Sequence, residues 1–107
     1  MDLHQLADCL KALGDPTRLK IIALLNLRDF CVCELIPIFN ISQPAVSKHL
    51  NRLKTSGLVT ENRRGQWVFY SLNRKKLEEI GYGLNHLPDF STEIEELDKQ
   101  GLLVKCD

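Results

Sequence analysis

The segment from Ser42 to Gly57 constrains the fold most strongly, because it carries the signals of one short, well-bounded amphipathic helix. Ser42 can cap that helix, and Pro44 is compatible with its first turn. Apolar residues recur on one side at helical spacing, at Val46, Leu50 and Leu53. The opposite side carries polar and cationic residues, namely Gln43, Ser47, Lys48, Asn51 and Arg52. The sequence therefore predicts a helix over about 43–55 that packs through one face and presents a polar, basic face outward.

Helical and strand-like patterns surround this helix. Helical spacing predicts helices over about 3–13, from Pro16 onward, over about 33–39 and over about 74–87. A last short helix should start near Ser91-Thr92, with Thr92 and Glu95 at capping-box spacing, and end at Gly101. Residues 58–72 are rich in strand formers, and Arg64-Gly65 fits a hairpin tip. This order predicts a winged helix-turn-helix, mainly α with a small β-hairpin, as a single domain over 1–107.

Charge is distributed unevenly although the formal net charge is zero. Residues 42–76 carry eight Lys or Arg side chains and one acidic residue, whereas residues 77–107 carry eight acidic residues and two lysines. A basic segment is the electrostatic footprint of a surface that faces phosphates, and an ordinary solvated face is the alternative. The helix-turn-helix pattern inside the basic segment favours double-stranded DNA as the partner.

The predicted DNA contacts lie on two elements. One is the helix over about 43–55, called the recognition helix below, and the other is the hairpin over about 58–72, which forms the wing. The major groove admits one helix, and short polar side chains near its N-terminus can reach base edges. Base and phosphate contacts are expected from Gln43, Ser47, Lys48 and His49, and a phosphate contact from Arg52. Helix packing is the alternative role for His49. Arg63 and Arg64 are expected to contact DNA from the wing tip, unless they only keep a sheet edge soluble.

Cys31 and Cys33 stand directly upstream of the predicted recognition helix. Thiolates select soft ions such as arsenite, antimonite, cadmium, lead or zinc over hard cations. Cysteine acting as a small buried hydrophobic residue is the alternative. Residues two apart on a regular helix point about 200° apart, because each residue turns ~100°. Binding through both sulfurs is therefore expected to require or create an irregular first turn, which would shift the helix that supports the recognition helix.

These motifs resemble the ArsR/SmtB family of bacterial metal-responsive repressors over roughly residues 3–87. The resemblance is carried by residues 13–19 (LGDPTRL), 42–50 (SQPAVSKHL), 56–59 (SGLV) and 65–70 (GQWVFY). Residues 31–35 (CVCEL) look like the metal-binding box of the arsenic- and cadmium-sensing branches. The resemblance implies a homodimer that represses its own operon and leaves the operator when metal binds. We expect the inducer to be As(III) or Sb(III). It also implies dimerisation through helices 3–13 and 74–87, where the apolar candidates are Leu3, Leu6, Leu10, Leu84 and Leu87.

The third ligand of such a site is where this sequence departs from the family pattern. A third cysteine commonly follows the pair by three positions in the arsenic-sensing branch, and Ile36 stands there. Three-thiolate coordination would then need Cys9 or Cys106, from either subunit, and Cys9 is favoured over Cys106. A two-thiolate site is the other option. Residues 74–87 lack the Asp/His and His/Glu pairs of the family's zinc site.

Other functions compete with an arsenite-released repressor. The same repressor could sense Cd(II), Pb(II) or Zn(II), or could sense thiol oxidation or persulfides through a pair such as Cys33 and Cys106. A winged helix that binds only protein is disfavoured by the basic segment. An enzyme is not expected, because no carboxylate pair, nucleophile–base set or phosphate loop stands out. No apolar run approaches the ~20 residues of a membrane span, and the N-terminus lacks a signal-peptide pattern, so a cytoplasmic protein is expected.

Overall fold

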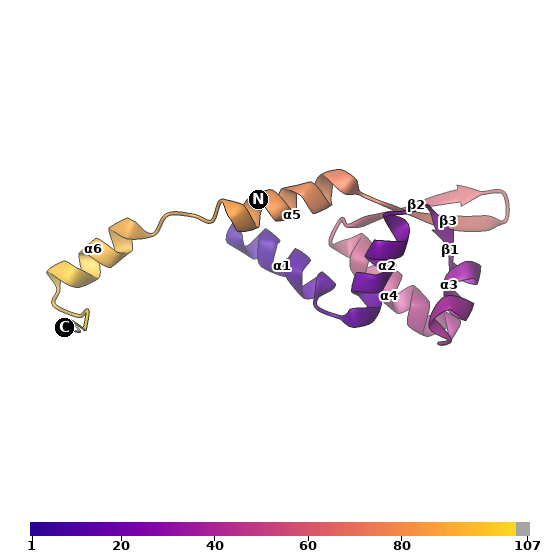
Figure 1. Cartoon of the computed structure of the whole chain (residues 1–107), viewed down its shortest axis with the longest axis horizontal. Helices are drawn as coiled ribbons and strands as arrows, with labels where there is room; N and C mark the ends of the chain where they lie inside the picture. The colour runs from indigo at the N-terminus through magenta and orange to yellow at the C-terminus, as the bar shows by residue number, and fades with distance from the viewer. Residues whose placement is uncertain (105–107) are drawn as a thin grey trace.

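The computed structural model describes residues 1–104, and in this part of the chain six helices accompany a small antiparallel sheet (Figure 1). Its dimensions are 64 × 24 × 20 Å, because the last helix extends away from the other elements. The elements follow in the order α1 (Leu3–Leu13), α2 (Pro16–Leu25), β1 (Phe30–Cys31), α3 (Val32–Phe39), α4 (Gln43–Thr55), β2 (Val59–Arg64), β3 (Trp67–Leu72), α5 (Arg74–Asn85) and α6 (Ser91–Lys99).

The helices begin where local capping satisfies their first free N–H groups. The Asp2 carboxylate accepts from the Gln5 N–H to start α1, and the Asp15 carboxylate accepts from the Arg18 N–H to start α2. Ser42 caps α4 in the same way, with Oγ 3.3 Å from the Ala45 nitrogen. The predicted span of the recognition helix, 43–55, is confirmed.

The sheet contains one strand more than the predicted hairpin. Strand β3 lies in the centre, in the order β1-β3-β2, and both pairings are antiparallel. The added strand is Phe30–Cys31, which pairs opposite Tyr70 and Phe69. Two residues are too short for a period-2 pattern to be visible in the sequence, so this strand was not predictable from alternation. It attaches the cysteine segment directly to the wing.

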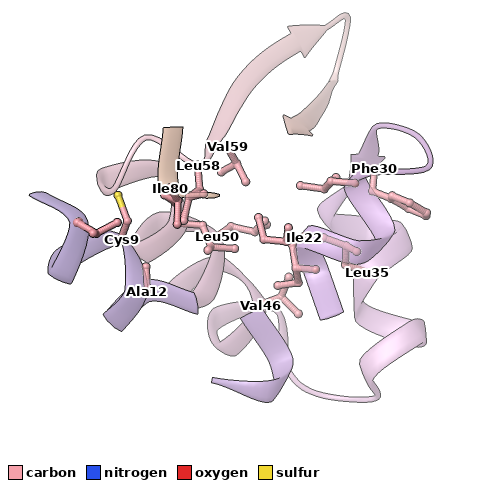
Figure 2. Packing of buried hydrophobic residues seen from close by; sticks show 14 residues of the cluster. Cys9, Ala12, Ile22, Phe30, Leu35, Val46, Leu50, Leu58, Val59 and Ile80 are labelled. Atoms are coloured by element: carbon pink, nitrogen blue, oxygen red, sulfur yellow. The ribbon is translucent and has the colours of Figure 1, made fainter. Parts of the chain in front are cut away.

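The hydrophobic core lies between α1, α2, α3, α4, α5 and the base of the wing (Figure 2). The stripe predicted for α4 is fully buried, with Val46, Leu50 and Leu53 all at 0% exposure. The other buried core residues are Leu6, Cys9, Ala12, Ile21, Ile22, Leu25, Phe30, Leu35, Leu58, Val59 and Ile80. This packing fixes the orientation of α4, so its polar face points away from the core.

Helix α6 contributes no buried residue to this core. The capping box predicted from Thr92 and Glu95 is wrong. The helix starts at Ser91 with Phe90 at the cap position and no side-chain cap, so Thr92 lies inside the first turn. The Ser91 N–H donates instead to the Asp89 carboxylate at 2.9 Å. The described residues contain no helix long and apolar enough to cross a membrane.

Candidate nucleic-acid interface and thiol site

The outward face of α4 carries the residues predicted to contact DNA. Gln43, Ser47 and Lys48 are exposed, whereas His49 and Arg52 are half-buried. The buried stripe on the opposite side anchors the helix. The predicted residues divide between two places: Lys48, His49 and Arg52 line a groove beside α4, whereas Gln43 lines a separate hollow at the start of the helix.

A groove of about 540 Å³ runs beside this face, and Arg18 of α2 completes its cationic lining together with Lys48 and Arg52. The Arg18 side chain is fixed, because Nε donates to the Ala12 carbonyl at 2.6 Å and Nη1 lies 3.3 Å from Nδ1 of His49. A guanidinium only donates, so Nδ1 of His49 accepts in this geometry. The Asp15 carboxylate lies 3.8 Å from the same nitrogen. Sequence reasoning missed Arg18 because it comes from another helix, and His49 takes part in the packing between α2 and α4.

The two wing arginines differ in their surroundings. Arg63 and Arg64 are both exposed on β2. Arg64 forms an ion pair with Asp29, with Nη2 2.7 Å from Oδ2, and its guanidinium lies 4.6 Å from the centre of the Phe69 ring. Hydrogen bonding from Arg64, together with Ser71, lowers the pKa of Asp29 below its usual value of 3.8. Arg64 thus ties the wing to the residue two positions before Cys31.

Cys31 and Cys33 occupy the start of α3, but not one regular helical turn. Cys31 is the cap residue, with extended backbone at φ −83° and ψ 152°, and its sulfur accepts from the Cys33 N–H at 3.3 Å. Cys33 is the second residue of the helix itself. The two cysteines therefore do not share one regular helical turn, because Cys31 has extended backbone and Cys33 is helical.

Glu34 and Arg28 complete the surroundings of the thiol pair. Glu34 Oε1 accepts from the Cys31 N–H at 2.9 Å, which completes a capping box, and its Oε2 lies 2.8 Å from Arg28 Nη2. These two bonds lower the pKa of Glu34, with the Cys31 N–H as the main cause. Hydrogen bonding with Cys31 raises the pKa of the Cys33 thiol, and burial and nearby negative charge add to this. The two thiols are thus close enough to affect each other's ionisation.

A hollow of about 240 Å³ opens beside the pair, between α3, the wing and the start of α4. The two cysteines, Val32, Ile36, Gln43, Gln66, Trp67 and Val68 line it. Cys31 is only 5% exposed, whereas Cys33 is exposed. Trp67 and the two glutamines were not predicted here, because the hairpin brings them together from distant parts of the chain. The hollow places Gln43, a predicted DNA contact, beside the thiols.

The structure does not bring Cys9 to this pair within one chain. Cys9 is 3% exposed on α1, and its sulfur donates to the Ser56 carbonyl at 3.7 Å. It lies at the opposite end of the core from Phe30, the neighbour of Cys31 (Figure 2). Cys106 lies outside the described residues. Among residues 1–104, no group of three His, Cys, Asp or Glu side chains is arranged to hold a metal.

The faces of α1 and α5 carry exposed apolar side chains. Leu3, Leu10 and Leu84 are 37–48% exposed, whereas Leu6 is 5% exposed and belongs to the core. Leu87 is 59% exposed but lies beyond α5, which ends at Asn85 and not at the predicted residue 87. Leu6 packs where α1 meets α5, with its side chain about 3.4 Å from the position of a Cβ on Gly83. Leu6 is therefore a core residue of the single chain, while the other four leucine side chains remain on the surface.

The fold and this surface define a winged helix-turn-helix regulator. Residues 15–61 match the family model described as "Bacterial regulatory protein, arsR family". The chain is 42% identical over 78 residues to the transcriptional repressor SdpR of Bacillus subtilis, covering 72% of this chain and 87% of that protein. It is 38% identical over 85 residues to the arsenical resistance operon repressor of Staphylococcus xylosus, covering 79% and 82%. The chain belongs to the arsR family of bacterial regulatory proteins.

Solved structures agree with this assignment. An ArsR-like transcriptional regulator from Rhodococcus sp. RHA1 superposes with a TM-score of 0.70 at 28% identity, covering 91% of this chain and 86% of that one. The repressor BigR from Xylella fastidiosa gives a TM-score of 0.62 at 30% identity, with 80% and 89% covered. Proteins of this family are DNA-binding transcriptional regulators and not enzymes. Membership of the family therefore confirms the expectation of a DNA-binding regulator and the expectation that the protein is not an enzyme.

Proposed function

We propose that this regulator binds operator DNA as a homodimer and is released when As(III) or Sb(III) binds Cys31 and Cys33. The observation that carries the proposal is the position of the two thiols in a hollow that also contains the first residue of the recognition helix. Its relatives include proteins named as arsenical resistance operon repressors. The single domain over 1–107, with DNA contacts on α4 and the wing, belongs to this proposal.

The contacts around the thiols suggest how a bound metalloid would reach the DNA-binding elements. Cys31 pairs with Phe69 of β3, so movement of its backbone is transmitted to the wing. Gln43 lines the hollow at the start of α4. An inducer acts only if it binds better to the DNA-free conformation than to the DNA-bound one. A metalloid that pulls the two sulfurs together would change these contacts and so favour one conformation.

Operator binding by fluorescence anisotropy tests the proposal, using the promoter fragment of the protein's own gene. Arsenite or antimonite should weaken binding of the wild type by about 5–150-fold, the usual range of allosteric coupling. Cys31→Ser and Cys33→Ser should keep DNA affinity and lose this response. Serine is well suited to the Cys31 position, because Ser is a favoured N-cap and its oxygen can accept the Cys33 N–H. Loss of folding is therefore not expected to confuse the result.

The same titration separates the competing inducers. A response to Cd(II), Pb(II) or Zn(II), but not to arsenite, would replace the metalloid with a metal. A response to oxidant or persulfide alone, with a crosslink detected by mass spectrometry, would make the protein a redox sensor. An unchanged arsenite response in Cys31→Ser and Cys33→Ser would contradict the proposed site, and Cys9→Ser and Cys106→Ser test the third ligand.

A further inference from the structure

The hollow beside the cysteines combines two thiols with an apolar wall. Cys31 and Cys33 line it together with Val32, Ile36, Trp67 and Val68. Ile36 lies one helical turn after Cys33 and lines the same hollow, so a hydrocarbon side chain occupies this part of the site. The residues described, 1–104, offer no cluster of three metal-binding side chains. The site therefore provides two exchangeable sulfur ligands and, next to them, surface suited to a hydrocarbon group.

We propose that the preferred ligands of this site are monosubstituted trivalent arsenicals, R–As(OH)₂, in which R is a methyl or an aryl group. The inference rests on the proposed function, because it assumes that the inducer binds Cys31 and Cys33. Arsenous acid has three hydroxyl groups that thiols can displace. In R–As(OH)₂ the As–C bond does not exchange, so two thiols complete the coordination and no third is required.

The binding step is a double substitution without electron transfer. Two As–O bonds break and two As–S bonds form, while each thiol proton leaves with a hydroxide as water. The products are R–As bound to two sulfurs and two molecules of water, and arsenic stays trivalent. No oxidant or reductant takes part. The two cysteines line the same hollow, and the Cys33 N–H donates to the Cys31 sulfur at 3.3 Å.

The apolar wall gives the organic group a place to bind. A closed apolar cavity of about 150 Å³ is enough to hold benzene, and this hollow measures about 240 Å³. Trp67 is 48% exposed, so an aryl group can cover part of its ring. Gln43 and Gln66 add amide groups to the lining. An aryl substituent buries more apolar surface here than a methyl group does, and a hydroxyl group gains nothing from such a wall.

Titration calorimetry of the reduced full chain tests this preference, with hydrated phenylarsine oxide, methylarsonous acid and arsenous acid as ligands. The phenyl compound should bind at least about tenfold more tightly than the methyl compound, because of its larger buried apolar surface. Arsenous acid should bind most weakly. Mass spectrometry should find one R–As group per chain, added with the loss of two waters. Trp67 is the only tryptophan of the chain, so its fluorescence should respond to the phenyl compound.

Three variants distinguish the contribution of the apolar wall to ligand preference from the general affinity of thiols for arsenic. Trp67→Ala should reduce the phenyl-over-methyl preference several-fold. Ile36→Cys adds a third thiol and should raise the affinity for arsenous acid at least about tenfold. Ile38→Ala is the matched control, since Ile38 lies on the same helix, is 39% exposed and is not part of the lining. It should leave all three affinities unchanged.

The possible failures are distinguishable. Binding that survives in Cys31→Ser and Cys33→Ser would overturn the proposed function and this inference together. Binding that needs both cysteines, yet is as tight for arsenous acid as for the phenyl compound, would overturn only the inference. An unchanged phenyl-over-methyl ratio in Trp67→Ala would also overturn it, because the wall would then play no part in selection.

Discussion

Cys31 has two structural roles before any ligand is considered. It is the cap of α3, where its sulfur accepts the Cys33 N–H, and it is also part of β1, opposite Phe69. Capping by sulfur is weaker than capping by Ser or Asp oxygen, because sulfur is a poor acceptor. A residue chosen for helix stability alone would carry oxygen at this position. Helix capping alone therefore does not explain the thiol at this position.

The Tyr70 phenol has a strongly raised pKa. Burial and its hydrogen bond to Glu61, with the oxygens 2.8 Å apart, raise the pKa of the phenol from 10.0 to about 12. Folding therefore favours the protonated phenol. Its contribution to stability is complete below about pH 10 and is lost as the pH rises through about 12. Ultraviolet titration in a Tyr82→Phe background should give this value for Tyr70, and adding Glu61→Gln should bring it closer to 10.0. Equal values in the two proteins would contradict the assigned role of Glu61.

Leu35 provides the test of packing under the thiol pair, because it is 0% exposed on α3. Leu35→Ala should lower the free energy of unfolding by about 2–5 kcal/mol, through lost burial and an unfilled cavity. Urea denaturation at fixed protein concentration measures the change, since dimerisation would make stability depend on concentration. Leu27→Ala is the control: this side chain is 80% exposed, and the expected change is within about 0.5 kcal/mol. Equal losses in both variants would mean that α3 does not pack on the core as described.

At the scale of elements, the helices were predictable and the thiol site was only partly so. The α4 stripe of Val46, Leu50 and Leu53 repeats at helical spacing, and local caps determine where helices start. Strand β1 was missed because its two residues become a strand only through pairing with Tyr70 and Phe69. Trp67 could not be assigned to the thiol hollow for a similar reason. Its place there depends on how the hairpin folds back on α3, which no local pattern encodes.

Arg64 of the wing already forms an ion pair with Asp29. The prediction about DNA binding by the wing therefore concerns Arg63. If Arg63 contacts a phosphate, Arg63→Ala should weaken binding to all DNA sequences alike. The slope of log K against log salt should then fall by about 0.9 for each phosphate contact removed. Anisotropy titrations over a range of salt concentrations measure the slope. Lys99→Ala removes a charge from α6, where the side chain is 76% exposed, and should leave the slope unchanged. A full slope in Arg63→Ala would restrict the DNA contacts to α4 and its groove.

At the scale of the whole molecule, the position of the thiols matters more than their number. The core joins α1, α2, α3, α4 and α5 into one body, so α4 cannot move far by itself. The segment 28–34 instead contacts three of the features proposed to bind DNA: the wing through Cys31 and Phe69, Arg64 through Asp29, and the start of α4 through the shared hollow. In the proposed mechanism, a small shift in this segment would therefore change several of the proposed DNA contacts together.

The outward faces of α1 and α5 lead to the prediction about assembly. Leu3 and Leu84 are 45% and 48% exposed, and burying such side chains in a second copy would offset the cost of association. One recognition helix reads few base pairs, whereas a dimer reads two half-sites about 34 Å apart. Sedimentation should give about twice the chain mass of 12.2 kDa for the wild type. Leu3→Glu and Leu84→Glu should shift the protein toward monomer and weaken operator binding at least about tenfold, because an unpaired carboxylate is costly to bury. Leu27→Glu, on the loop before β1, should remain dimeric. Monomeric wild type with full operator affinity, or dimers in all three variants, would rule out this face as the interface.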